Sequence, residues 1–240
     1  MTILIALYKE NFAMIATDTR ITLLDQTEKP YDDNYSKLCS HYSVWLAGIG
    51  YGPLVTTFRS NVESNNTCKT EQFEPIFRMV CNNMLQTLMQ PNTLDPNQIY
   101  WLLNTTILFT LPYQQDGVFH MTIKSLNFQT GQKELDMNKV SIFPPGNFED
   151  VNQLIQIYEP LIESSSNLDE LVYTIARLIK EVSHINQGIS NICDFGFLIK
   201  DPKKLLLKVN IKEPADIIIE AYNKNCLSNY WKVISEFPLP

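Results

Sequence analysis

The first twenty residues, "MTILIALYKENFAMIATDTR" (residues 1–20), carry the pattern that decides the fold. Two short apolar runs, residues 3–7 and 12–16, lie on either side of the polar residues 9–11. Apolar runs of this length that flank a short polar turn are typical of two paired strands. The chain is therefore expected to begin with a β-hairpin.

The register of this hairpin determines which side chains face each other. If the turn is centred on Glu10, facing residues have numbers that sum to about twenty, and Thr2 then lies opposite Asp18. A slip of one residue places Thr19 opposite Thr2 and leaves Asp18 adjacent. Facing side chains of an antiparallel pair lie within a few ångströms of each other. The start of the chain is therefore predicted beside an acidic side chain, with Arg20 close by.

The remaining sequence alternates between groups of strands and pairs of helices. Strands are expected at residues 2–8, 12–17, 21–24, 105–113, 118–128, 133–136, 139–143, 192–199 and 204–210, with a further hairpin across residues 36–50. Helices are expected at residues 52–62, 70–90, 148–163 and 168–185. A loop is expected at residues 92–98. Strands kept apart from paired helices favour an α+β fold over a doubly wound sheet. Two packed sheets covered on both sides by helix pairs satisfy this order.

The 240 residues have the composition of a globular protein, with 45% hydrophobic and 19% charged residues. A chain of this length can bury a sizeable core. We predict one domain over residues 1–240, with a helical or irregular tail from about residue 212. The net charge of −7 is spread along the chain without a basic stripe. This argues against a dedicated nucleic-acid-binding protein, because such proteins cluster lysine and arginine to neutralise phosphates.

The five cysteines are irregularly spaced without a C-x-x-C motif, and the three histidines lie far apart. These spacings support neither a disulfide framework nor a zinc site. The apolar run at residues 3–8 is too short for a signal peptide, and no segment reaches membrane-spanning length. The protein is therefore expected to be cytoplasmic, without a metal or organic cofactor and without a nucleic-acid or membrane partner.

Thr2 gains chemical interest if Met1 is removed, which methionine aminopeptidases do when the second residue is small. Thr2 then carries a hydroxyl group and a free α-amine. The reference pKa of an α-amine is about 7.7–8.0, so part of it is unprotonated near neutral pH. A threonine paired with its own amine is one recognised way to activate a hydroxyl nucleophile. A nearby lysine would lower the pKa of that amine, and an aspartate would hold the lysine in place.

Four features of the first fifty residues resemble proteasome-type β subunits and their bacterial relatives. Thr2 precedes Asp18 by sixteen positions, T-D-T-R stands at residues 17–20, S-K-L at residues 36–38 and L-A-G at residues 46–48. The strand and helix order is similar to that family along nearly the whole chain. The resemblance implies a four-layer αββα sandwich of two antiparallel sheets flanked by helix pairs, the fold of N-terminal nucleophile (Ntn) hydrolases.

The same resemblance implies roles for four residues. Thr2 is the nucleophile, Lys37 tunes its amine, Asp18 orients Lys37, and the N–H of Gly48 lines an oxyanion hole. Arg20 supports this group. The resemblance also implies assembly into homo-oligomeric rings or spirals and a peptide or protein substrate.

The segment from Asp18 to Lys37 is longer than is typical of the family, that from Lys37 to Gly48 is shorter, and two further parts of the sequence depart from the family pattern. P-P-G-N at residues 144–147 replaces a glycine-serine-glycine element, and "HINQGISNICDFG" at residues 184–196 replaces a late aspartate and a serine-glycine-glycine run. Ser190, Asn191 or Asp194 could substitute there for the groups that steady the threonine amine. These departures indicate an outlying bacterial or archaeal proteasome homologue.

Three hypotheses for function follow from the sequence. The first is a threonine-type amide-bond hydrolase that uses Thr2; if an amine instead of water resolves its acyl-enzyme, the same site is a transpeptidase or ligase. The second is a catalytically silent assembly or binding subunit, because the late aspartate and serine are missing. The third is an unrelated two-sheet binding protein. Cys39 lies close to Lys37 in sequence, but a buried apolar cysteine is the favoured interpretation of it.

Overall fold

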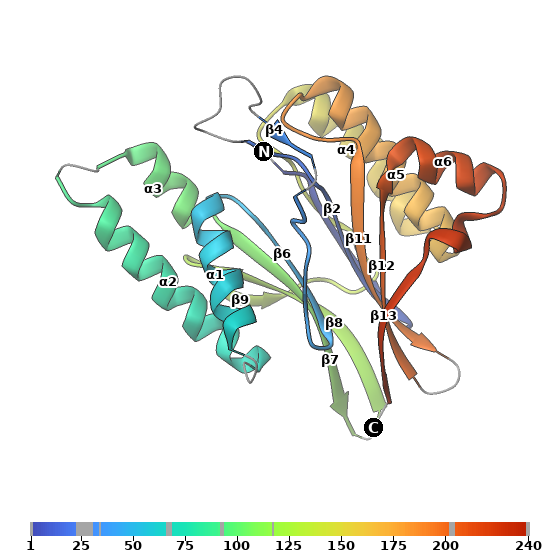
Figure 1. Cartoon of the computed structure of the whole chain (residues 1–240), viewed down its shortest axis with the longest axis horizontal. Coiled ribbons are helices and arrows are strands. Elements are labelled where there is room, and N and C mark those ends of the chain that lie inside the picture. The colour runs from blue at the N-terminus through green and yellow to red at the C-terminus, as the bar shows by residue number, and fades with distance from the viewer. Residues whose placement is uncertain are drawn as a thin grey trace.

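The computed structural model describes residues 2–22, 31–33, 35–65, 69–91, 94–116, 118–201 and 205–238. Two antiparallel sheets lie face to face in the middle of the molecule, and a group of helices covers the outer face of each (Figure 1). The fold is α+β with four layers, as predicted.

The first sheet contains the N-terminal hairpin at its centre. Its strand order is β10 (Ser141–Phe143), β1 (Leu4–Lys9), β2 (Phe12–Asp18), β11 (Ile192–Asp201), β12 (Leu205–Pro214) and β13 (Lys232–Pro238). Its outer face is covered by α4 (Glu149–Ser164), α5 (Leu168–Ile185) and α6 (Ala215–Asn223), and a short 3-10 helix, η2 (Leu227–Tyr230), precedes β13. The hairpin strands β1 and β2 are buried on both faces, which explains why they read as continuous apolar runs.

The second sheet is built from five strands that are paired in chain order. Its order is β5 (Cys39–His41), β6 (Val44–Ile49), β7 (Thr106–Gln115), β8 (Val118–Asn127) and β9 (Gly131–Glu134). Its helices are α1 (Gly52–Ser64), α2 (Phe73–Leu88) and α3 (Pro96–Leu103), with a 3-10 turn, η1 (Thr70–Gln72), before α2. Two short strands, β3 (Ile21–Thr22) and β4 (Tyr31–Asp32), form a separate ribbon.

Three apolar clusters correspond to the three spaces between the four layers. One lies between the first sheet and α4 to α6, and another lies between the second sheet and α1 to α3. The third lies between the two sheets and joins Leu4, Ile15, Trp45, Leu108 and Leu198. Buried apolar area of this kind is the main favourable term in folding.

The register of the N-terminal hairpin differs from the centred one by one residue. Lys9 pairs with Phe12 and Leu4 pairs with Thr17, so the numbers of paired residues sum to 21. The turn therefore has two residues, and continuation of the register sets Ile3, not Thr2, opposite Asp18. The alternative with a one-residue slip, which leaves Asp18 adjacent to Thr2, is the observed one.

Two further segments differ from the sequence expectation. The stretch predicted as a loop contains the start of α3, where the Asp95 side chain accepts hydrogen bonds from the N–H groups of Asn97 (2.9 Å) and Gln98 (3.3 Å). The tail contains α6 and then β13, where an irregular end was expected. The predicted strand at residues 21–24 is observed for its first two residues, and Leu23 and Leu24 lie outside the described residues.

Trp45 joins the two sheets at their interface. Its Nε1–H donates to the carbonyl of Phe197 at 2.9 Å, and its ring packs directly on the backbone of Gly196. A Cβ atom at position 196 would lie 2.5 Å from that ring, so glycine is required for this close approach. The ammonium of the fully buried Lys208 lies 4.7 Å from the centre of the Trp45 ring.

The burial of Lys208 predicts that the free energy of unfolding depends on pH. Its Nζ donates to the carbonyls of Tyr42 and Val44, both at 2.6 Å, and burial lowers the pKa of Lys208 to about 8. Between pH 8 and the unfolded value the unfolded chain binds more protons at this site, so the contribution of Lys208 to stability rises with pH. The Lys208→Met variant lacks this term. Its unfolding free energy minus that of the wild type should therefore fall by roughly 3 kcal/mol between pH 7 and pH 10.5.

Urea unfolding of both proteins across this pH range measures the difference, and comparison of the pair cancels the other groups that titrate there. A difference that stays constant with pH contradicts the burial of a charged Lys208.

Among the described residues, no helix is both long and apolar enough to span a membrane.

Candidate active site

Asp18, at the end of β2, lies at the centre of a buried cluster of donors. Lys37 Nζ contacts both of its carboxylate oxygens, at 2.8 and 2.9 Å. The backbone N–H of Ile3 donates to Oδ1 at 3.1 Å, and those of Arg20 and Ser190 donate to Oδ2 at 3.0 and 3.4 Å. Asp18 is fully buried and Lys37 is 7% exposed. The cluster therefore joins the start of β1, the end of β2, the segment before β5 and the turn before β11.

The burial of this ion pair shifts both of its groups. Burial raises the pKa of Asp18, while Lys37 and the N–H groups of Ile3 and Ser190 act in the opposite direction. Burial likewise lowers the pKa of Lys37, and Asp18 opposes that shift. Charges removed from water are costly unless each is matched by an opposite charge and by hydrogen bonds. The two-oxygen contact and the three backbone donors supply that match.

Thr2 lies next to this pair and is partly exposed. It precedes Ile3, whose N–H donates to the same Asp18 oxygen that contacts Lys37. The Cα atom of Thr2 is about 2.4 Å from the Ile3 nitrogen by standard bond geometry. The structure therefore brings Thr2, Asp18 and Lys37 together, whereas Thr2 and Lys37 are 35 positions apart in the sequence.

Ser190 connects the turn before β11 to the end of β2. Its Oγ accepts from the N–H of Thr19 at 3.1 Å and lies 3.0 Å from the Thr19 hydroxyl. Its own N–H donates to Asp18. Ser190 is fully buried, so it holds Asp18 and Thr19 in place through both its backbone and its side chain.

Arg20 joins Asp33 to the turn before β11. Its guanidinium contacts both carboxylate oxygens of Asp33, at 2.5 and 2.7 Å, and donates to the carbonyl of Gln187 at 2.5 Å. The hydrogen bond from Arg20 holds the pKa of Asp33 below its usual value. Arg20 therefore supports the site by tying two loops together, and Asp33 is a partner that the sequence interpretation did not include.

Asp194 contacts the residue before Lys37. Its Oδ2 is 2.9 Å from Ser36 Oγ, and its Oδ1 accepts from Asn210 Nδ2 at 2.9 Å. The carbonyl of Ser36 accepts from Arg59 at 2.7 Å. Burial raises the pKa of Asp194, against the hydrogen bonds from Asn210 and Ser36.

Gly48 lies on β6 in the second sheet, opposite Ile107 of β7. A Cβ atom there would lie 2.7 Å from Ile107 and 2.8 Å from Val55 of α1. Its neighbour Ala47 faces the other way, into the cluster between the sheets. The close packing of α1 on β6 is therefore sufficient reason for a glycine at this position, and an oxyanion role for its N–H stays a prediction.

Cys39 lies in an environment that disfavours a reactive thiol. It is buried, its Sγ is 2.8 Å from Glu63 Oε1, and burial raises the pKa of its thiol to about 12. The thiolate is the nucleophilic form of cysteine, and this environment disfavours it. The interpretation of Cys39 as a buried residue is confirmed.

In the part of the chain that the structure describes, no group of three or more histidine, cysteine or acidic side chains could hold a metal ion.

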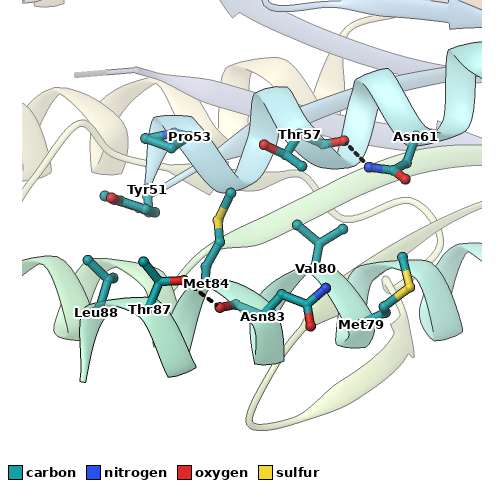
Figure 2. A pocket seen from close by; sticks show the side chains of 10 residues that line it. All are labelled: Tyr51, Pro53, Thr57, Asn61, Met79, Val80, Asn83, Met84, Thr87 and Leu88. Carbon is teal, nitrogen blue, oxygen red and sulfur yellow. Dashed lines mark hydrogen bonds between the residues drawn. The ribbon is translucent and has the colours of Figure 1, made fainter. Parts of the chain in front are cut away.

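A groove of about 360 Å³ lies between α1 and α2, on the outer helix layer (Figure 2). Met84 and Leu88 of α2 face Tyr51 and Pro53 at the start of α1 across it. None of its lining residues belongs to the Asp18 cluster. The groove and the candidate site are therefore separate features.

Comparison with solved structures gives the same fold. Anbu from Hyphomicrobium sp. strain MC1 matches with a TM-score of 0.61 and 12% identity, covering 95% of this chain and 96% of that chain. A mutant of the same protein gives a TM-score of 0.62 and 11% identity over 96% and 98% of the two chains. Anbu from Yersinia bercovieri, described as an ancestral beta-subunit, gives a TM-score of 0.60 and 9% identity over 95% and 96%. This chain has the Anbu fold.

The Anbu fold agrees with the layered sandwich that the proteasome-like motifs implied. No protein-family profile matches the sequence, and no curated protein matches it. The likeness at 9–12% identity extends over nearly the full length of both chains. It establishes the fold alone.

Sequence reasoning missed three side chains that hold the site, Asp33, Arg59 and Asn210, and it named Ser36 only as part of the S-K-L motif. Ser36 and Asp33 lie within five positions of Lys37, so a search of its neighbours for hydrogen-bonding side chains could have found them. Arg59 on α1 and Asn210 on β12 are distant in sequence, and no local pattern marks them.

Proposed function

We propose that this protein is a threonine-type amide-bond hydrolase whose nucleophile is Thr2, exposed by removal of Met1. The observation that carries the proposal is the buried Asp18–Lys37 pair, which is fixed by the N–H of the residue that follows Thr2. An ion pair at this depth costs free energy that a purely structural site could avoid with apolar residues. Its position beside the terminal threonine supports a chemical role.

The reaction begins with attack of Thr2 Oγ on the carbonyl carbon of the substrate. The α-amine of Thr2 takes the hydroxyl proton as the new C–O bond forms, and the carbonyl oxygen becomes an oxyanion. The protonated amine then gives this proton to the nitrogen of the leaving group, and the C–N bond breaks. The product is an ester between Thr2 and the acyl group of the substrate. Water, deprotonated by the same amine, hydrolyses that ester and restores Thr2.

Lys37 and Asp18 act on the electrostatics of this cycle. The Lys37 ammonium lowers the pKa of the Thr2 amine, because a nearby positive charge disfavours a second one. More of the amine is then neutral and able to act as base near pH 7. Asp18 holds the ammonium in place through two contacts. The N–H of Gly48 is proposed as the donor to the oxyanion.

We also propose a peptide or protein substrate and assembly of several copies of this chain. Both proposals rest on the likeness to the Anbu fold, one example of which is described as an ancestral beta-subunit. Gel filtration with light scattering tests the assembly. A monomer at micromolar concentration contradicts it.

Intact-mass analysis followed by a β-lactone probe tests the proposed function. The expected mass lacks Met1, and the probe should add one acyl group per chain. Thr2→Ala is the matched control, because alanine also permits Met1 removal but has no hydroxyl; it should not be labelled. Retention of Met1, or a processed protein that is not labelled, overturns the proposal and favours the silent subunit. Product formed with an added amine in place of water separates a transpeptidase from a hydrolase.

A further inference from the structure

The segment that carries Lys37 is held at one residue, Ser36, from three directions. Ser36 Oγ lies 2.9 Å from Asp194 Oδ2 of β11 and 2.9 Å from the carbonyl of Leu38. The Ser36 carbonyl accepts from Arg59 of α1 at 2.7 Å. A residue bound at both its side chain and its carbonyl has little freedom to move, and this restriction extends to the next residue in the chain.

Lys37 is that next residue, and its ammonium must meet both oxygens of Asp18 at 2.8 and 2.9 Å. A displacement of the Ser36 backbone moves the Lys37 Cα by a similar amount. Near a reacting group, misplacement by about 1 Å can lower a rate by about a hundredfold. The position of Ser36 therefore affects the placement of the ammonium.

Asp194 is a buried carboxyl whose side-chain hydrogen bonds join β12 to the segment before Lys37, while Lys212, which pairs with it across the sheet, and Arg59 favour its charged form. It is 1% exposed, and its hydrogen bonds come from the neutral side chains of Asn210 and Ser36. Burial of a carboxyl group is unfavourable unless its hydrogen bonds are satisfied. The hydrogen bonds of Asp194 to Ser36 and Asn210 hold the segment that precedes Lys37 against β11 and β12.

The donors and acceptors around the Ser36 hydroxyl show how its contact with Asp194 can be tested. The hydroxyl has one proton, and it faces two acceptors at the same distance, Asp194 Oδ2 and the Leu38 carbonyl. A donor at position 194 would satisfy both, because Ser36 Oγ would accept from it and donate to Leu38. An asparagine supplies such a donor, and its Oδ1 can still accept from Asn210.

We propose that Asp194 and Arg59 are positioning residues that set the place of the Lys37 ammonium by holding Ser36 on its two sides. This inference rests on the proposed function of Thr2, which it deepens. It differs from the sequence interpretation of Asp194, which placed that residue at the Thr2 amine. Asp194 acts through hydrogen bonds to Ser36 and not through its charge.

Four variants test this proposal by the rate of β-lactone labelling of Thr2 against pH. Asp194→Ala and Ser36→Ala are expected to lower the rate at pH 7 by roughly 10- to 100-fold and to move its pH midpoint upward. Asp194→Asn should restore most of the rate and the wild-type midpoint. Ser165→Ala is the matched control, because Ser165 is a buried serine that donates to the carbonyl of Leu161 in another part of the fold. It should match the wild type.

An NMR measurement separates failure of this inference from failure of the proposed function. The ¹³Cε resonance of Lys37, assigned by its loss in Lys37→Met, should move in Ser36→Ala and Asp194→Ala and stay in place in Asp194→Asn and Ser165→Ala. This result stands even if Thr2 proves unreactive. An unmoved resonance in Ser36→Ala, or equal effects of Asp194→Asn and Asp194→Ala, overturns the positioning role. Arg59→Met should shift the same resonance, and no shift there removes Arg59 from the proposal.

Discussion

Replacement of Lys37 by methionine is expected to lower the rate at which Thr2 is acylated at pH 7 by about 10²- to 10⁴-fold. The pKa of the Thr2 amine should rise, because the positive charge that disfavours its protonated form is gone. Less neutral amine is then present at pH 7. The rate should therefore recover partly as the pH is raised, with a midpoint above that of the wild type. Labelling with a β-lactone between pH 5 and pH 10 measures both effects.

Lys139→Met is a suitable control for this experiment. It also removes one lysine charge, but Lys139 is exposed and pairs weakly with Asp136 at 3.9 Å. Its pH profile should match that of the wild type. If Lys37→Met lowers the rate without moving the midpoint, Lys37 does not act on the amine, and the electrostatic role proposed for it is wrong.

Replacement of Asp18 by alanine is expected to cost about 3–5 kcal/mol of unfolding free energy. The variant leaves the buried Lys37 without its two carboxylate contacts, and the N–H groups of Ile3, Arg20 and Ser190 lose their acceptor. An unpaired buried charge and unsatisfied donors are among the most destabilising changes in a protein. Urea unfolding at pH 7 measures the loss.

A double-mutant cycle identifies the cause. Asp18→Ala combined with Lys37→Met should cost less than the sum of the two single variants, because the second change removes the unpaired charge left by the first. Arg78→Met, which breaks the partly exposed pair with Glu74 on α2, provides the comparison and should cost at most about 1 kcal/mol. Additive costs for Asp18 and Lys37 would contradict their coupling.

The hairpin and the layers could be predicted because the signal is local. The apolar runs around Glu10 and the amphipathic pattern of α5 are visible in the sequence itself, and α5 occupies the predicted residues 168–185. The hairpin register was less certain, because the turn of Glu10 and Asn11 lacks the glycine that usually marks a two-residue loop. The helix α3 was missed although Asp95 and Pro96 are a recognisable start signal.

The strand β13 could not be read from its own residues. It forms by pairing with β12, with a register shift beside Lys208, and Val233 and Ile234 are both about half exposed. No regular alternation is therefore visible in the sequence of this strand. Pairing with a distant strand, and not local propensity, determines it.

The candidate site also contains some residues that the sequence could predict and others that it could not. Asp18 was predicted beside the start of the chain from the hairpin register, Lys37 was selected by resemblance, and the structure brings the two into contact. The residues that hold them, above all Arg59 and Asn210, come from α1 and β12, and their contacts depend on how the layers pack. Asp194 was selected as well, but its partner is Ser36. A side chain's neighbours across a sheet cannot be read from its position in the chain.

Reaction with a peptide epoxyketone tests the central claim most directly. This reagent forms its stable ring only with a hydroxyl and a free amine on the same residue, so it reports both groups of Thr2 at once. Peptide mapping of the wild type is expected to place the adduct on an N-terminal peptide that begins at Thr2, with both bonds on that residue. An unmodified N-terminal peptide, or one that still begins at Met1, would contradict the account.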